Sequence, residues 1–542
     1  MRRILVWCIV LGIGGLGGGA PASGQAPPQL QDLVPTAGLA SNTVQELEAA
    51  GDSLWVGPLL TVYAEAEGQL FAPDDPVVNR RLGEGSNVVL SLAAEGGGGS
   101  ASTVWGGLAF DAGGGTAGAG GFLVSTDGGR SFAGRPAPLD DPADSTIAYG
   151  DSTLSAVPIT QEAGSPPRDL AIEPQADTVW VASGRSGLRR WTESDSSWAR
   201  TVLPPDTSTR ISPATPPDIL VAPPLDDGRG FQNYRAFSVL VDETGTVWAG
   251  TAAGLNRSTP DDVAPNGERA WRLFRPDGTP NSLTGQVVFG LAEQPRPSGR
   301  NPIWITTLRV EGGSVLQRSG LTVTPDGGET FRQPLVGEQV NDVAARRSRV
   351  YAAAESGLFV SADQGTTWQT VEEVALEEEG EVFPGSVTAR AVEVTPAALW
   401  VGTTEGLLRL DRADESRLIA EDPGASRPEW QLFRTEVAVN PESPSDQVPD
   451  VETYAYPNPF IPSRDEVVRI AYEVPEPQMV EVNIYDFGMN RVRTLREQEE
   501  EGQQEIIWDG TDASGLRLPT GTYLYTVEVG GTTVRGKILL SN

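Results

Sequence analysis

Residues 245–257 read GTVWAGTAAGLNR, and residues 397–411 read AALWVGTTEGLLRLD. In each stretch a short apolar run contains a tryptophan. A glycine follows a few residues later, where we expect a turn, and a leucine begins the next apolar run. Variants of this pattern occur seven times along the chain, and each has one aromatic residue at the position of the tryptophan. We call these residues the anchor aromatics: Trp55, Trp105, Trp180, Trp248, Trp304, Tyr351 and Trp400. Successive anchors lie 47 to 75 residues apart. Self-similarity at such a period, with several short strands per unit, is typical of a β-propeller.

Each unit also contains strand-like runs on both sides of its anchor. A short apolar run precedes the anchor, as in RDLAIEP (168–174) and ARAVEVTP (389–396). A further run follows the Gly-Leu turn, beginning at Leu188, Leu255, Leu321, Leu358 or Leu407. We expect the first run to be the innermost strand of a blade and the anchor run to be the second strand. The sequence therefore predicts an all-β protein with a seven-bladed β-propeller, followed by a small sandwich described below.

Three units carry a second motif of the form S/T-x-D-x-G-x-x-aromatic. Its copies are STDGGRSF (125–132), TPDGGETF (324–331) and SADQGTTW (361–368). The motif resembles the Asp-box, or BNR, repeat of sialidases, sortilin-type receptors and many secreted propellers. That resemblance implies a folding role for Asp127, Asp326 and Asp363, with each carboxylate accepting N–H groups inside a hairpin turn. A catalytic role is the alternative.

The anchor strings VWAGTAAGLNR and LWVGTTEGLLRLD resemble a different group, the periplasmic sensor propellers of two-component regulators. No kinase or transmembrane segment follows them here, so this resemblance implies the repeat and not the signalling.

The amino terminus predicts export. MRRILVWCIVLGIGGLGGGAPASGQA begins with two arginines, continues with an apolar stretch and ends in small residues. This order is typical of a secretory signal peptide over residues 1–26, with the propeller over 27–440. The apolar run is too short and too rich in glycine for a stable membrane anchor, so we expect no membrane span in the mature chain. Cys8, the single cysteine, lies in this leader, so the mature protein has no thiol or disulfide chemistry.

Composition excludes several kinds of partner and site. The chain has 73 acidic and 40 basic residues, a net charge of −33, which argues against nucleic acid and anionic lipid as partners. An acid-rich surface with a single lysine suits a salt-loving organism; the alternative is a surface tuned to a cation or a basic partner. The absence of histidine excludes Ser-His-Asp triads and histidine-ligated zinc. We expect no metal and no cofactor.

The last 90 residues or so form a different module. After a proline- and acid-rich linker at 441–453, the runs VVRIAYEV, MVEVNIYDF and YLYTVEV alternate as strands of a small antiparallel sandwich over 454–542. The strings YPNPF (456–460), WDGTDASGLRLPTGTYLY (508–525) and GKILL (536–540) resemble the FlgD-like Ig domain that serves as the C-terminal sorting domain of type IX secretion substrates. The resemblance implies type IX secretion machinery as a partner and an extracellular or outer-surface location. An ordinary structural Ig-like domain is the alternative. WDGTDASG also predicts a tight hairpin leading into the following strand.

Aligning the innermost strands suggests which side chains reach the propeller axis. One column contains Glu46, Asp169 and Asp342 among small residues, and the preceding column contains Arg168 and Arg390. Arg168, Asp169, Asp342 and Arg390 are therefore candidates for a polar channel mouth. The alternative is that these residues cap strand ends and bind water.

No reaction follows from this pattern, and we nominate no catalytic residue. The favoured function is a secreted or cell-surface binding or scaffold protein, whose ligand is a surface protein or polysaccharide. A glycan-active hydrolase of sialidase-like or xyloglucanase-like propeller type is the alternative, since it needs only two carboxylates facing one pocket.

Overall fold

The computed structural model describes residues 33–433 and 453–540 apart from short gaps. The gaps are 37–38, 40–42, 52, 74, 85–86, 97–102, 114, 174–177, 193–195, 226–227, 266, 311–316, 372, 377–381, 385–386, 420–426, 457–459, 461, 463–466, 487–489 and 500–501. The expected signal peptide and residues 441–452 of the expected linker lie outside the described residues. Contacts divide the chain into two compact units, residues 1–434 and 435–542.

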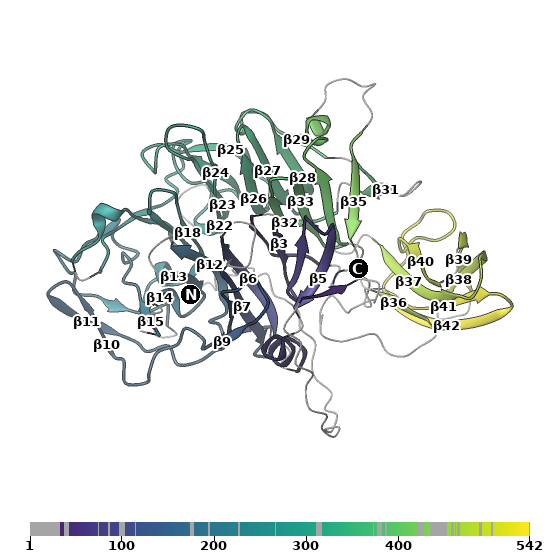
Figure 1. Ribbon diagram of the computed structural model, residues 1–542, viewed down its shortest axis with the longest axis horizontal. Helices are drawn as coiled ribbons and strands as arrows, with labels where there is room; N and C mark the ends of the chain where they lie inside the picture. The colour runs from purple at the N-terminus through teal and green to yellow at the C-terminus, as the bar shows by residue number, and fades with distance from the viewer. Residues whose placement is uncertain are drawn as a thin grey trace. The chain divides into compact units, whose positions relative to one another are not determined.

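The first unit is built from mainly antiparallel sheets, and the four main strands of each propeller-type sheet lie side by side in sequence order (Figure 1). The first strands are β2 (Leu47–Ala50), β6 (Val88–Glu95), β12 (Pro167–Glu173), β18 (Ala236–Val241), β22 (Val287–Glu293), β26 (Val340–Arg346) and β32 (Ala389–Val394). The second strands are β3 (Ser53–Val56), β7 (Thr103–Asp111), β13 (Thr178–Ser183), β19 (Val247–Thr251), β23 (Ile303–Leu308), β27 (Arg349–Ala354) and β33 (Ala398–Thr403). Each second strand carries one predicted anchor aromatic.

The outer strands complete these sheets. The third strands are β4 (Thr61–Ala64), β8 (Ala117–Ser125), β14 (Gly187–Thr192), β20 (Gly254–Ser258), β24 (Gly320–Thr324), β28 (Gly357–Ser361) and β34 (Leu407–Asp411). The fourth strands are β5 (Gln69–Pro73), β9 (Ala133–Arg135), β15 (Ser197–Arg200), β21 (Trp271–Phe274), β25 (Arg332–Val336), β29 (Gln369–Thr370) and β35 (Glu429–Phe433). The helices of the described residues are short: α1 (Pro76–Val78), η1 (Asn79–Glu84), η2 (Gln232–Tyr234), η3 (Pro260–Asp262) and η4 (Glu415–Ile419).

The first strands contact one another in a closed cycle. Each contacts the first strand of the next sheet, from β2 through β6, β12, β18, β22 and β26 to β32, and β32 contacts β2. Sheets joined in this way surround an axis, with their first strands innermost. The first unit is therefore β-propeller-like, and the predicted order of innermost strand and anchor strand matches the observed pairing.

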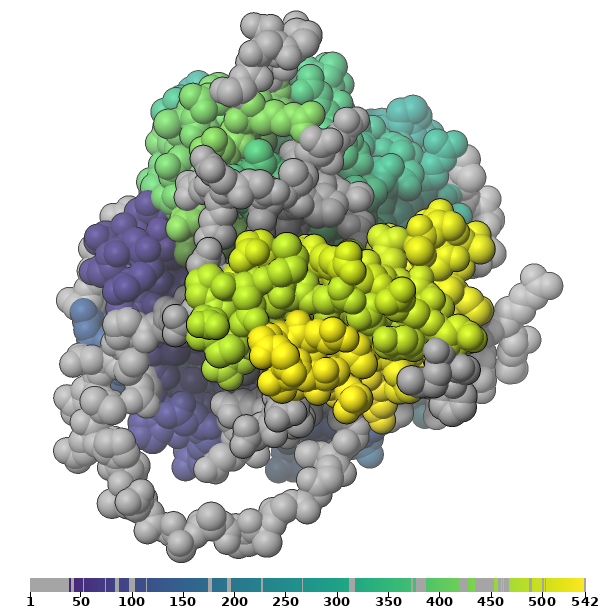
Figure 2. Space-filling view, turned by 90° about the vertical axis from the view of Figure 1, so that its right-hand side faces the viewer, coloured from purple at the N-terminus to yellow at the C-terminus, as the bar shows by residue number. Residues whose placement is uncertain are grey.

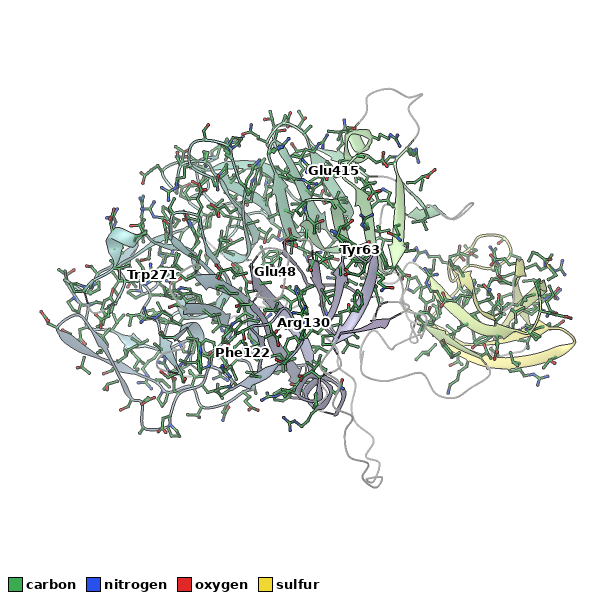
Figure 3. The ribbon with its side chains drawn as sticks, in the orientation of Figure 1. Glu48, Tyr63, Phe122, Arg130, Trp271 and Glu415 are labelled. Atoms are coloured by element: carbon green, nitrogen blue, oxygen red, sulfur yellow. The ribbon has the colours of Figure 1, made fainter. Side chains whose placement is uncertain are left out.

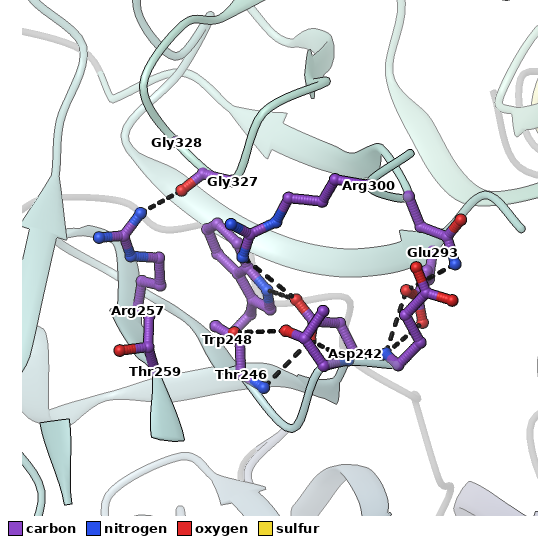
Figure 4. A network of polar contacts seen from close by, with 12 residues as sticks. Asp242, Thr246, Trp248, Arg257, Thr259, Glu293, Arg300, Gly327 and Gly328 are labelled. Carbon is purple, nitrogen blue, oxygen red and sulfur yellow. Dashed lines mark hydrogen bonds and ion pairs between the residues drawn. The ribbon is translucent and has the colours of Figure 1, made fainter. Parts of the chain in front are cut away.

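The anchor aromatics are buried between sheets, with exposed fractions of 0 to 3%. Several also have a fixed polar partner. The indole N–H of Trp248 donates to Asp242 Oδ2 at 2.9 Å, and that of Trp304 donates to Gln294 Oε1 at 3.1 Å. Asp242 also accepts the N–H of Thr246 and lies 3.8 Å from Arg300 Nη2 (Figure 4). The residue after the first strand thus orients the anchor, because a buried indole N–H needs an acceptor.

The ring closes between the sheets of β2 and β32 without exchanging a strand. The Val44 N–H donates to the Thr403 carbonyl at 2.9 Å, and the rings of Tyr63 and Trp400 meet edge-on at 4.7 Å. The Arg409 guanidinium lies 5.8 Å from the Tyr63 ring and 2.6 Å from a Glu65 oxygen. Apolar packing, one cation–π contact and one ion pair therefore join the first repeat to the last.

Additional strands enlarge some sheets. β1 (Leu33–Thr36) pairs with β5, β16 (Arg210–Ile211) pairs with β21, and β30 (Glu373–Leu376) with β31 (Val382–Pro384) extends the sheet of β35. β10 (Thr146–Tyr149), β11 (Ser152–Ala156) and β17 (Leu220–Val221) form a separate sheet, here called the insertion sheet. Its strands come from the two longest intervals between anchors, 105–180 and 180–248.

The second unit, coloured yellow-green to yellow in Figure 2, consists of two sheets around one apolar core. One sheet has the order β36-β37-β40 and the other the order β39-β38-β41-β42. The strands are β36 (Thr453–Tyr456), β37 (Val468–Val474), β38 (Gln478–Tyr485), β39 (Arg491–Glu499), β40 (Gly502–Trp508), β41 (Gly521–Val529) and β42 (Thr532–Leu540). Tyr523 and Tyr525 are both buried, as expected for alternate residues that share a face.

The tight hairpin turn predicted at WDGTDASG is present, but it does not pair the two long strands that flank it. A tight turn is present, since the Asp512 N–H donates to the Leu516 carbonyl at 2.9 Å and an isolated bridge joins Thr511 to Arg517. However, β40 and β41 belong to different sheets, so the segment crosses between sheets instead of pairing its flanking strands. Turn chemistry fixes the local bend but does not determine which strands pair. The described residues contain no helix long and apolar enough to cross a lipid bilayer.

Candidate functional site

A cavity of about 560 Å³ lies where the first strands meet, and residues of all seven first strands or their immediate neighbours line it. The four predicted residues, Arg168, Asp169, Asp342 and Arg390, are all part of its wall. Figure 3 labels a further wall residue, Glu48, in the middle of the first unit. We call this space the central cavity.

A repeated bulge positions the predicted arginines. The pairing of first and second strands skips one residue at Arg168, at Asn341 and at Arg390. A bulged residue is left out of the ladder, and the strand bends there, which redirects its side chain. The sequence column containing these residues is therefore a column of bulges, which the alternation of apolar and polar residues could not indicate.

The two predicted aspartates join neighbouring sheets. Asp169 Oδ1 accepts the Leu170 N–H and Oδ2 accepts the Val239 N–H of the next first strand, both at 2.8 Å. Asp342 repeats the arrangement, accepting the Val343 N–H at 2.8 Å and the Val392 N–H at 2.9 Å. Each carboxylate is therefore a staple between consecutive first strands.

The neighbouring strand leaves room for each staple. In the alignment of first strands, the residue equivalent to Asp169 in the following sheet is Ser238, and the residue equivalent to Asp342 in the following sheet is Ala391. Both side chains are small and buried. Glu46 follows the same rule, since its Oε1 accepts the Leu92 N–H at 3.1 Å beside the buried Ser91. An acid in one sheet thus faces a small residue in the next, which explains why small residues and carboxylates share this column.

Four further acids line the central cavity and were missed by the sequence reasoning: Glu48, Glu95, Glu293 and Glu393. Glu48 Oε1 accepts the Ala94 N–H at 3.1 Å, and Glu393 Oε1 accepts the N–H of Val394 at 2.7 Å. Glu48 follows Glu46 by two residues, and Glu393 follows the column residue Ala391 by two. Residues i and i+2 of a strand share a face, so extending the alignment column by two positions would have found Glu48 and Glu393.

Burial perturbs these carboxyl groups strongly. Loss of solvation raises the pKa of Asp169 to about 7 and that of Glu393 to about 7, although main-chain hydrogen bonds oppose the shift. The pKa values of Glu46 and Glu48 are raised well above their usual range, first by burial and then by neighbouring carboxylates. Burial also raises the pKa of Asp342. The cavity therefore holds protons near neutral pH that exposed acids would release.

The arginines are engaged at the rim. The Arg168 guanidinium lies 5.5 Å from the centre of the Phe237 ring, and Arg390 Nη1 lies 3.0 Å from Glu355 Oε1. The structure thus brings the four predicted residues to one cavity, with the aspartates paired to main-chain N–H groups. Within the part of the chain that the structure describes, no cluster of three or more acidic side chains has the geometry of a metal site.

The three predicted turn aspartates lie elsewhere, in the turns after β8, β24 and β28. Asp127 Oδ1 accepts the N–H groups of Arg130 and Ser131, each at 3.0 Å, and Oδ2 accepts the Ser131 hydroxyl. Asp326 and Asp363 make the corresponding bonds. These contacts satisfy the donors of the turn.

Each of these turns also leans on the preceding sheet. Gly129 takes φ of 89°, and a Cβ built there would lie 2.2 Å from the Trp55 ring. Phe132 meets the same ring edge-on at 6.4 Å. Only glycine allows both that backbone conformation and that close approach. Gly365 is packed in the same way against the anchor Trp304, whereas Gly328 packs against Phe274, so each turn contacts an aromatic ring of the sheet before it.

Comparison with known proteins identifies the second unit most clearly. The family model of the FlgD Ig-like domain matches residues 463–533. No curated protein matches the chain.

Solved structures resemble the chain only distantly. PorZ, a surface component of the type IX secretion system of Porphyromonas gingivalis, is 14% identical over 92% of this chain and 75% of its own, with a TM-score of 0.35. The GH74 xyloglucanase of Xanthomonas campestris is 12% identical over 94% and 74%, with a TM-score of 0.46. The extracellular domain of a hybrid two-component system of B. thetaiotaomicron is 11% identical over 92% of this chain and 74% of its own, with a TM-score of 0.24. These values are too low to transfer a site or an activity. The chain carries an FlgD Ig-like domain at its C terminus, which follows a β-propeller-like unit in the sequence.

Proposed function

We propose that this protein is a secreted or cell-surface binding or scaffold protein, built as a seven-bladed β-propeller and exported through its C-terminal domain. The observation that carries the binding role is the engagement of the central carboxylates. Asp169 and Asp342 each use both oxygens on main-chain N–H groups, and Glu46 and Glu48 each accept an N–H from the next strand.

This engagement favours recognition over acid–base chemistry. A carboxylate that exchanges protons with a substrate must point toward that substrate. The carboxylates described here must instead keep pointing at the main-chain N–H groups of the next first strand, because those hydrogen bonds join neighbouring sheets. The central cavity is instead a rigid acidic recess, and rigid recesses with a few fixed polar groups are typical binding sites. Its ligand is a surface protein or a polysaccharide with a cationic or hydrogen-donating group.

The test is a glycan-array and peptide-binding screen on the full-length protein, followed by an assay for new reducing ends. We expect bound ligands whose affinity falls when Arg390 is changed to Gln, and no release of reducing ends. A matched control is Arg412→Gln, because Arg412 is exposed and lies outside the cavity wall. A screen without any ligand, or affinity that is equal in both variants, would contradict the proposed site.

The second candidate is a glycan-active hydrolase, and one observation favours it. Asp169 and Glu393 line the same cavity, and their pKa values of about 7 suit a general acid at neutral pH. Under this alternative the reducing-end assay becomes positive, and Glu393→Gln abolishes the activity while the protein remains folded. Hydrolysis of that kind would replace the binding proposal.

A further inference from the structure

A second cavity, of about 420 Å³, lies in the first unit between the insertion sheet and the sheet that begins with β12. All four residues of β10 line it, and so do residues 198–200 of β15. Among the described residues, β10 and β15 are each the outermost strand of their sheet and have a neighbour on one side only. Figure 1 labels both strands at the left of the first unit. Two strand edges therefore border this space, which we call the insertion cavity.

The hydrogen bonds of β10 show which of its main-chain groups point outward. The Ala156 N–H donates to the Ser145 carbonyl at 2.8 Å, and β10 then pairs with β11 without a bulge from Thr146 to Tyr149. In an antiparallel pair, residues that bond to the partner strand alternate with residues that do not. Because Ser145 faces β11, Thr146 and Ala148 turn their N–H and C=O groups away from it. Both residues are exposed.

The same reasoning applies to β15. The Thr201 N–H donates to the Leu188 carbonyl at 3.0 Å, and the pairing with β14 continues without a bulge back to Ser197. Thr201 therefore faces β14, whereas Trp198 and Arg200 turn their main-chain groups away from it. Within the part of the chain that the structure describes, no strand pairs with the outer edge of β10 or of β15. The insertion cavity is thus bordered by the outward N–H and C=O groups of two strands.

These two edges lack the features that usually prevent strand pairing. Proteins protect exposed edges with charged residues, proline or very short strands. The sequence of β10 is TIAY, without a charge or a proline, and β15 is SWAR. The single guanidinium of β15, that of Arg200, is held by Asp140 and by the Val157 carbonyl at 2.9 Å. By contrast, the edge strand β25 contains Pro334, and the edge strand β29 has two residues. The cavity therefore combines two edges that are free to pair.

The buried part of the wall is apolar. Trp180, Trp271, Tyr149 and Ala156 line the cavity and belong to one buried core cluster. Successive side chains of a β-strand point to opposite faces. A strand lying in the cavity would therefore direct every second side chain toward this cluster.

The remaining wall is fixed and carries mixed charges. The Tyr149 hydroxyl donates to the Arg269 carbonyl at 2.9 Å, and the Gly150 N–H donates to Glu268 Oε2. These bonds tie the hairpin of β10 and β11 to the segment before β21, so the edges hold their positions before any ligand arrives. The charged side chains of the wall include both carboxylates and guanidiniums, so net charge does not select the ligand. The main-chain groups of the two edges do.

We propose that the insertion cavity binds an extended peptide segment of a partner protein, which adds a strand between β10 and β15. Its main-chain donors and acceptors pair with Thr146 and Ala148 on one side and with Trp198 and Arg200 on the other, as peptides do when they extend a sheet. Apolar side chains at alternate positions of the peptide contact the core cluster. The site is independent of the central cavity and of the function proposed for it.

Selection of random peptides displayed on phage, with the full-length protein as target, supplies the probe. The best enriched peptide is synthesised, and its Kd is measured by fluorescence polarisation. We expect enriched sequences with apolar residues at alternate positions. Binding should slow hydrogen exchange in residues 145–149 and also in residues 197–201, because an inserted strand bonds to both edges. Absence of an enriched peptide, or protection of one edge alone, would overturn the proposal.

A proline substitution tests the edge of β10. Ala148→Pro removes an outward N–H but no bond to β11, and edge strands tolerate proline at such positions. We expect the Kd of the peptide to rise roughly tenfold or more. Thr370→Pro is the matched control: since the Val371 N–H donates to the Leu358 carbonyl, Thr370 also points outward from its edge strand, β29, outside the insertion cavity. Its Kd should stay within about twofold of the wild type. Equal Kd values in the two variants would contradict the site.

A change in the peptide decides the question if Ala148→Pro fails to fold. N-methylation of every second residue removes the donors that face one edge, and methylation of the intervening residues removes those that face the other edge. For a strand inserted between two edges, both modified peptides should bind the wild-type protein roughly tenfold or more weakly than the unmodified peptide. If one of them kept its affinity, the peptide would lie along a single edge, and insertion between β10 and β15 would be wrong.

Discussion

At the scale of single residues, this acidic chain uses its carboxylates in two opposite environments. The turn aspartates are half-exposed or exposed and surrounded by donors, and the N–H and hydroxyl of Thr367 lower the pKa of Asp363 to about 2. The central carboxylates are half-buried in the cavity wall, and loss of solvation raises their pKa values. Part of this was predictable: the S/T-x-D-x-G pattern indicated the turn contacts, but no local pattern indicated that Asp169 would bond to a strand 70 residues away.

Removing a turn carboxylate should weaken the fold without affecting binding. Asp127→Ala leaves the N–H groups of Arg130 and Ser131 without their acceptor, which we expect to cost about 1–2 kcal/mol of unfolding free energy. Chemical unfolding measures the loss, and Asp151→Ala, at an exposed turn aspartate, is the control. Reduced ligand binding at an unchanged melting temperature would contradict the structural role of the motif.

The buried acids should make stability depend on pH in a defined direction. The pKa of Glu393 is about 7 in the folded protein and near 4.5 in the unfolded chain, so the folded state binds more protons between these values. The contribution of Glu393 to stability is therefore present below pH 4.5 and is lost as the pH rises toward 7.

Glu393→Gln keeps an oxygen that accepts the Val394 N–H but removes this titration. Its unfolding free energy, relative to the wild type, should increase between pH 4.5 and 7.5 by on the order of 3 kcal/mol. Urea unfolding across that range measures the difference, with Glu95→Gln at an exposed glutamate as the control. A difference that stays constant with pH would show that Glu393 does not titrate in the folded protein.

At the scale of elements, the repeat predicted strands better than it predicted their connections. The first strands and the anchor strands could be predicted because they are buried in the same way in every repeat, and burial produces a recognisable pattern of apolar residues. The insertion sheet was missed because β11 pairs with β17 from a different interval, and both are short and partly polar. The bulges were missed because a skipped residue leaves the composition of a strand unchanged.

The closing seam between the first and last repeats should be a weak joint that depends on Arg409. This side chain contacts Tyr63 and Trp400 and forms ion pairs with Glu65 and Asp411. Arg409→Met keeps an apolar stem but removes the charge, so we expect a loss of about 1–2 kcal/mol. Hydrogen exchange should quicken together in β3 and β33, which lie on opposite sides of the seam.

Arg412→Met provides the comparison, because Arg412 is exposed and its guanidinium donates to the Pro396 carbonyl of its own sheet's connecting turn. Faster exchange in β33 alone, with β3 unchanged, would show that Arg409 stabilises its own sheet and does not close the ring.

At the scale of the whole molecule, each compact unit has its own apolar core. The second unit buries Trp508, Tyr472, Tyr525 and several valines and isoleucines between its two sheets. The sequence predicted this unit from alternating strands and from specific strings, and the family match at 463–533 agrees. Its function as an export address is a separate matter, because a fold alone does not specify a partner.

A unit with its own core should fold and act when detached, which makes the export proposal testable. We expect deletion of residues 451–542 to leave a folded first unit in the periplasm, since the ring of first strands closes without them. Fusing 451–542 to a reporter with a signal peptide should send the reporter to the surface or medium of a type IX-competent host. A fusion of 435–452 alone is the control and should stay periplasmic, because it lacks the sandwich. If the truncated protein still reached the surface, the C-terminal domain would be an ordinary Ig-like module, and export would have to depend on the β-propeller-like unit.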